Sequence, residues 1–104
     1  MSDFSTKKSS KSSMDSRFKV KEPDLYKVVM LNDNYTTMDF VVEILIGIFG
    51  KTEAEARKIM LSIHKKGSGV AGVYVYDIAV SKIAQVDEKA KKEGFPLKCI
   101  VEKE

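Results

Sequence analysis

The sequence predicts an α+β protein: a small three-stranded antiparallel sheet covered on one face by three helices. Apolar patterns typical of strands and helices follow one another in the order strand, helix, helix, strand, helix, strand. The chain has 104 residues, which allows one domain with one hydrophobic core. Because each of these elements is apolar on one side, a helix layer packed on a single sheet buries all of them together.

The first 24 residues differ in composition from the rest of the chain. They are rich in Ser and Lys and nearly free of aliphatic side chains, and Pro23 stands near their end. Such a segment cannot bury enough apolar surface to offset the entropy of ordering it. We therefore expect residues 1–24 to be a disordered N-terminal extension and residues 25–104 to be the folded domain.

The folded domain should begin with a strand over residues 25–31, which are rich in aromatic and β-branched side chains. Residues 32–34 are Asn-Asp-Asn and predict a turn, because these side chains bond their own backbone. An apolar helix follows from about residue 38 to 49. Its candidate N-caps are Thr37 and Thr36, and the latter starts a Thr-x-x-Asp sequence that resembles a capping box.

The second half of the domain has clearer boundary signals. Residues 52–55 form a capping box that starts a second helix, and the Gly-Ser-Gly sequence at 67–69 ends it. Residues 70–76 predict a strand, and Asp77 is a candidate N-cap for a third helix. A glycine and a proline end that helix before a last strand over residues 97–101, where apolar and charged side chains alternate.

Composition excludes several classes of protein. The net charge is only +3, from 18 basic and 15 acidic residues, so a nucleic-acid-binding surface is not expected. The longest apolar run, residues 44–49, is too short to cross a membrane. The N-terminus has no hydrophobic segment of a secretory signal, and the single cysteine cannot form an internal disulfide. We expect a cytoplasmic protein with no metal and no cofactor.

The sequence offers only weak candidates for catalysis. Cys99 lies on the same face of the last predicted strand as Leu97 and Val101, which is an apolar face. We therefore expect a buried and unreactive thiol. His64 is the only histidine and lies at the end of a helix, where it can interact with the last carbonyls. Gly67-x-Gly69-x-x-Gly72 follows a helix and precedes a strand, which is the reverse of a dinucleotide-binding context. No nucleophile with a base beside it is evident, and the protein is not expected to be an enzyme.

Four segments together resemble the ClpS family of N-end rule adaptors. They are residues 26–41 (YKVVMLNDNYTTMDFV), 59–67 (IMLSIHKKG), 72–74 (GVY) and 95–99 (FPLKC). They occur in the family's order and at plausible spacing, and the resemblance covers residues 25–104. It implies an adaptor that binds proteins with a free α-amino group and a large hydrophobic first residue (Leu, Phe, Tyr or Trp) and delivers them to the ClpA unfoldase of the ClpAP protease.

The resemblance also implies roles for particular residues. The α-amino group of the substrate would be held by residues that match Asn32, Asp33, Asn34 and His64. The first side chain would enter an apolar pocket, whose matching residues are Thr36, Met38, Val41, Met60, Ile63 and Leu97. The N-terminal domain of a ClpA-type AAA+ unfoldase would dock at positions that match Asp77 and Lys82.

This sequence departs from the family pattern at three positions. Asn34 stands where the family usually has a second acid, Thr37 where Pro is frequent, and Asp77 where Glu is usual. The first departure removes a negative charge beside the expected amino-group site. A rival interpretation is another small protein-interaction module of similar fold that does not recognise N-termini, because fold alone does not determine function. A small hydrolase that uses His64 is a further alternative. We expect a monomer.

Overall fold

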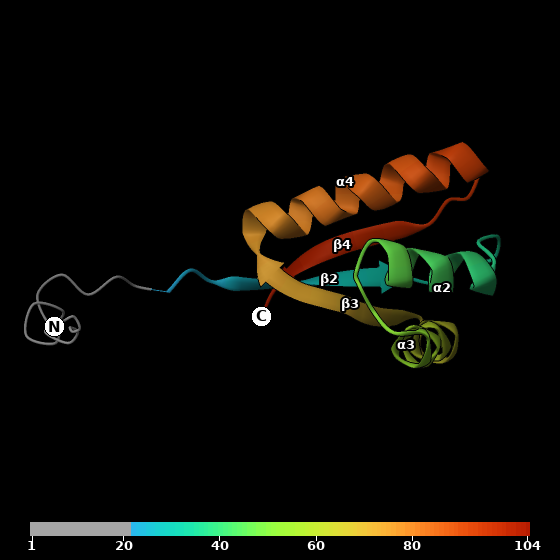
Figure 1. Cartoon of the computed structure of the whole chain (residues 1–104), viewed down its shortest axis with the longest axis horizontal. Helices are drawn as coiled ribbons and strands as arrows, with labels where there is room; N and C mark the ends of the chain where they lie inside the picture. The colour runs from blue at the N-terminus through green and yellow to red at the C-terminus, as the bar shows by residue number, and fades with distance from the viewer. Residues whose placement is uncertain (1–21) are drawn as a thin grey trace, which may run out of the picture.

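The computed structural model describes residues 22–104, and its elements follow in the predicted order (Figure 1). They are β2 (Leu25–Leu31), α2 (Met38–Gly47), α3 (Glu53–Lys66), β3 (Ser68–Val75), α4 (Tyr76–Glu93) and β4 (Lys98–Lys103). The predicted fold class is therefore confirmed. Most of the predicted disordered extension, residues 1–21, lies outside the described residues. None of the helices in the described part is long and apolar enough to span a membrane.

The three strands form one antiparallel sheet in the order β3-β2-β4, so the first strand of the domain is the central one. At one end of the sheet Leu31 pairs with both Ser68 and Lys98. The register between β2 and β3 shifts once, between Val28 and Val29. The end of β2 is thereby held between the start of β3 and the start of β4, and the turn after β2 leaves the sheet at this place.

One face of the sheet is covered by all three helices. Val28 and Met30 of β2 are fully buried beneath them, and Ile44, Leu45 and Val86 are the largest of the helix side chains buried to the same degree. The helix α4 packs against all three strands, while α3 packs against α2 and β3 (Figure 1). Burying these large aliphatic side chains stabilises the fold by about 1.5–3 kcal/mol each.

The starts of the first two helices follow the local sequence signals. Thr37, not Thr36, is the N-cap of α2, and its hydroxyl oxygen accepts a hydrogen bond from the Phe40 amide at 3.1 Å. The capping box predicted for α3 is present, because Thr52 and Glu55 each accept a bond from the other's backbone amide. The helix α2 ends at Gly47, two residues earlier than predicted.

The junction between α3 and β3 is tighter than predicted. Gly67 alone ends the helix, in the left-handed conformation with φ of 91°, and the strand begins at Ser68 and not at residue 70. Gly69 then passes directly under α3. A Cβ atom at this position would lie 2.8 Å from Cγ1 of Ile63 and 3.3 Å from the carbonyl oxygen of Ile59. The absence of a side chain at Gly69 therefore lets the strand approach the end of the helix.

The start of α4 differs from the prediction. Tyr76 belongs to the helix and not to the preceding strand, and Val75 is the N-cap without a side-chain hydrogen bond. Asp77 lies in the first turn of the helix and does not cap it. The positive end of the helix dipole stabilises a negative charge at this position. The reason is tertiary: the ring of Tyr76 packs edge-on against Tyr26, with centroids 5.1 Å apart, and this contact fixes where the helix begins.

The close contact at Gly69 predicts a contrast between two glycine substitutions. Gly69→Ala should lower the free energy of unfolding by about 1–3 kcal/mol, because Ile63 must move away from the new methyl group. Gly47→Ala is the matched control. Gly47 is exposed in α2 and no atom lies within 4 Å of a Cβ built there, so this change should stabilise by up to about 1 kcal/mol. Urea denaturation of both variants tests the pair, and equal stabilities would contradict it.

Candidate functional site

Nine of the ten residues predicted to bind a substrate's first residue line one hollow. Its volume is about 250 Å³, and it lies between the turn after β2, the first turns of α2 and the end of α3. The lining residues are Asn32, Asp33, Asn34, Thr36, Met38, Val41, Met60, Ile63 and His64. Among residues 22–104, none outside the predicted set lines it. Segments about 30 positions apart in the sequence therefore form one site.

A backbone hydrogen bond that continues the pairing of Leu31 with Ser68 joins the two polar segments. The amide of Asn32 donates to the carbonyl oxygen of Gly67 at 2.9 Å. Asn32 is the first residue after β2, and Gly67 follows His64 by three positions at the end of α3. The turn and the helix end are therefore fixed side by side, and both Asn32 and His64 are exposed at the mouth of the hollow.

The turn after β2 is organised by one carboxylate. Oδ1 of Asp33 accepts hydrogen bonds from the amides of Tyr35 at 2.8 Å and Thr36 at 2.6 Å, and Oδ2 accepts one from the Thr36 hydroxyl at 2.7 Å. Burial by itself would raise the pKa of Asp33, but the bonds from Thr36 and Tyr35 outweigh it and lower the pKa. The carboxylate is thus held ionised in the loop.

The other half of the hollow is apolar. Val41, Met60 and Ile63 are buried, at 6%, 7% and 3% exposure, and come from α2 and α3. Met38 is the first residue of α2 and is 44% exposed, so it lies at the rim and not in the wall. The hollow therefore combines a polar mouth with an apolar interior.

The size of the hollow suits one large side chain. An apolar protein cavity of about 150 Å³ is known to admit benzene. The hollow of this protein, at about 250 Å³, has room for an aromatic ring or a branched aliphatic side chain. It is an open depression with no room for a folded domain or a nucleotide-sized ligand buried within it.

Leu97 is the predicted pocket residue that does not line this hollow. It is buried in the hydrophobic core at 4% exposure. The surface depression that it borders is a different one, formed with residues of the C-terminal half of α4 and the segment before β4. Its family-implied role in holding the first side chain stays a prediction.

The two residues matched to unfoldase docking lie in different environments. Asp77 is exposed in the first turn of α4. Lys82 is half-buried: its Nζ donates to the carbonyl oxygen of Ile48 at 2.7 Å and lies 5.7 Å from the centre of the Tyr74 ring. Because Ile48 is the C-cap of α2, the ammonium satisfies a carbonyl that the helix leaves free and stabilises that helix end.

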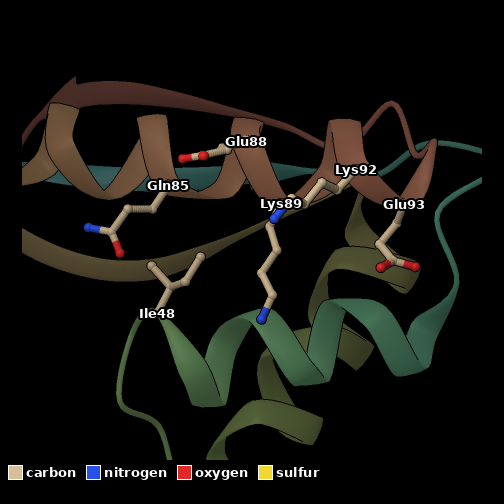
Figure 2. A pocket seen from close by; sticks show the side chains of 6 residues that line it. All are labelled: Ile48, Gln85, Glu88, Lys89, Lys92 and Glu93. Atoms are coloured by element: carbon tan, nitrogen blue, oxygen red, sulfur yellow. The ribbon is translucent and has the colours of Figure 1, made fainter.

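A larger hollow lies elsewhere on the molecule, between α4 and the C-terminal end of α2 (Figure 2). Its volume is about 520 Å³, and Ile48, Gln85, Glu88, Lys89, Lys92 and Glu93 line it. Lys89 extends toward α2, where its Nζ lies 3.7 Å from a carboxylate oxygen of Glu43 (Figure 2). Side chains of both charges border this groove, and none of the predicted site residues borders it.

The enzyme candidates do not gain support from the structure. Burial, with a smaller contribution from the negative charge of Asp87, raises the pKa of the Cys99 thiol to about 12, so it is unreactive at neutral pH. Within residues 22–104 no group of three His, Cys, Asp or Glu side chains is placed to hold a metal ion. His64 borders the hollow together with Thr36, whose hydroxyl donates to the Asp33 carboxylate.

The fold and the hollow define a small binding module, and comparison with known proteins identifies its family. The family model described as "ATP-dependent Clp protease adaptor protein ClpS" matches residues 21–100. The chain belongs to this family of Clp protease adaptors.

Named relatives and a solved structure agree with this assignment. The ATP-dependent Clp protease adapter protein ClpS of Acetivibrio thermocellus is 61% identical over 84 residues, which are 81% of this chain and 85% of that protein. The ClpS of Syntrophus aciditrophicus is 58% identical over 81 residues, 78% of this chain and 76% of that protein. The structure of Agrobacterium tumefaciens ClpS2 bound to L-phenylalaninamide superposes with a TM-score of 0.77 at 40% identity and covers 80% of this chain and all of that one.

Proposed function

We propose that this protein binds the N-termini of other proteins and delivers them to a ClpA-type AAA+ unfoldase. The substrates would begin with a free α-amino group on Leu, Phe, Tyr or Trp. One observation supports this proposal most. The same hollow has a polar mouth and an apolar interior that is large enough for one such side chain. The structurally similar ClpS2 of Agrobacterium tumefaciens binds L-phenylalaninamide, which carries a free α-amino group and a large hydrophobic side chain.

The polar mouth has the chemistry that an ammonium group requires. A protonated α-amino group has three donors and no acceptor, so its site must present acceptors. The side-chain oxygens of Asn32 and Asn34 and a neutral imidazole nitrogen of His64 can accept, while Asp33 adds a negative charge. These residues border the hollow from two sides, the turn after β2 and the end of α3.

The apolar interior supplies the second part of the recognition. Burying one large hydrophobic side chain against Val41, Met60 and Ile63 contributes about 1.5–3 kcal/mol. An affinity in the micromolar range requires about 8 kcal/mol, so neither this burial nor the few polar bonds suffices alone. The site would therefore select chains that present the amino group and the side chain on the same residue.

The same proposal assigns a second surface to the unfoldase. Asp77 and Lys82 of α4 match the family's docking positions, and Asp77 is exposed. The other interaction-module interpretation of this fold predicts no preference for free N-termini. A comparison of free and blocked peptides therefore separates the two functions.

Acetylation of the peptide should abolish most of the binding. It removes the positive charge and two donors, and it leaves acceptors in the mouth without partners. For a peptide that begins with Leu or Phe we expect a loss of at least about 2 kcal/mol, roughly 30-fold in Kd. Fluorescence anisotropy with matched free and acetylated peptides measures it. Equal affinities would refute recognition of the amino group.

A variant of His64 tests the same interaction from the protein side. His64→Ala should weaken binding of the free peptide by a similar factor and change the affinity for the acetylated peptide little. Its fold should persist, because the side chain is exposed. Lys65→Ala, at the neighbouring exposed position outside the hollow, is the control for a general effect of changes at the end of α3.

Met38 should act as a gate for the shape of the first side chain. Its long flexible side chain at the rim would admit an unbranched Cβ but crowd a β-branched one, whose rotamers are stiff. We expect Met38→Ala to bind peptides that begin with Ile or Val, which the parent rejects. Leu61→Ala, exposed on α3 outside the hollow, should keep the parental selectivity. A Met38 variant that still rejects both residues would exclude the gate.

The amide at position 34 should weaken the grip on the ammonium only slightly. Asn34→Asp restores a charge at an exposed position of the mouth, where solvent and salt screen it to about 0.3–1.5 kcal/mol. We expect binding to tighten by up to roughly tenfold and to become more sensitive to salt. Titrations at low and high ionic strength measure both effects. A weaker complex at low salt would show that the mouth is built around an amide.

A further inference from the structure

The loop at the mouth of the hollow consumes most of the acceptor capacity of its one carboxylate. Two carboxylate oxygens offer about four acceptor positions. In Asp33, Oδ1 accepts from two backbone amides, Tyr35 and Thr36, and Oδ2 accepts from the Thr36 hydroxyl. At 2.6–2.8 Å these are the short distances of charge-assisted hydrogen bonds. One acceptor position of the four is left for a ligand.

The same three bonds determine where the neighbouring groups lie. They close the chain from residue 33 to residue 36 into a tight turn at the mouth of the hollow, which Asn32 and Asn34 also line. They also fix Thr36 immediately before Thr37, the N-cap of α2. The first residue of that helix is Met38 at the rim of the hollow. The carboxylate thus connects the polar mouth to the apolar rim.

We propose that Asp33 is a positioning residue, which acts on the bound amino group through the loop that it folds and not mainly as its ionic partner. The direct acceptors of the amino group are then Asn32, Asn34 and His64. This inference rests on the proposed function for its ligand. It differs from the role that the family resemblance implies for this carboxylate, which is to hold the ammonium itself.

Two substitutions of Asp33 separate the roles. Asp33→Asn removes the charge and keeps the shape: its amide oxygen can accept from both backbone amides, and its NH2 group can donate to the Thr36 hydroxyl, which accepts as well as donates. Asp33→Ala removes the charge and the loop bonds together. A positioning residue is rescued by Asn, whereas an ionic partner is not.

The test is the affinity for L-phenylalaninamide. Asp33→Asn should weaken binding by less than about fivefold, the scale of a solvent-screened charge. Asp33→Ala should weaken it by more than about tenfold, since the loop bonds to two amides are lost. If the two variants lose affinity equally, Asp33 is the ionic partner and the proposal is wrong.

A measurement without peptide tests the loop directly. Hydrogen exchange at the amides of Tyr35 and Thr36 should be slow in the parent and in Asp33→Asn, and fast in Asp33→Ala, while the core amides of β2 stay protected in all three. Fast exchange in the parent would refute the positioning role. N-acetyl-phenylalaninamide separates the two failures: if the parent binds it as well as the free amine, the proposed function is wrong, and the exchange rates still decide what Asp33 does.

Discussion

The site depends on the hydrogen bond between the Asn32 amide and the Gly67 carbonyl oxygen, 2.9 Å long. It forms because Gly67 ends α3 in the left-handed conformation and sends the chain straight into β3, which pairs with β2 up to Leu31. Antiparallel pairing places the end of one strand beside the start of the other. The turn after β2 and the last turn of α3 must therefore meet, and the two polar segments of the mouth belong to them.

Local sequence signals account for most of the fold but not for every boundary. The capping box at Thr52 depends only on neighbouring residues, and it was predictable. The choice between Thr36 and Thr37 was not, because it is decided by Asp33, which occupies the Thr36 hydroxyl and leaves Thr37 to cap. The start of α4 at Tyr76 likewise depends on a ring contact with Tyr26, fifty positions earlier in the chain.

The residues of the candidate site were predictable only through the family resemblance. Composition and periodicity gave no reason to join Asn32 with His64, since a polar turn and a histidine at a helix end are each ordinary features. The structure brings nine of the ten predicted residues to one hollow. The turn bonds of Asp33 are local and agree with the turn predicted at residues 32–34. The contact of Lys82 with the C-cap of α2 spans 34 positions, depends on tertiary packing, and was indicated by no motif.

An adaptor must hold a substrate and its unfoldase at the same time, and the spacing of the two surfaces bears on this requirement. Asp77 lies beside Tyr76, which packs on Tyr26 at the start of β2, whereas Asn32 follows the end of that strand. Six residues of strand span roughly 20 Å. Lys82 contacts the C-terminal end of α2, while Met38 begins it, roughly 15 Å away along a ten-residue helix. Along β2 and along α2 alike, the proposed docking residues lie near one end of the element and the hollow lies near the other end. The proposed docking residues would therefore contact the unfoldase at a distance from the mouth of the hollow.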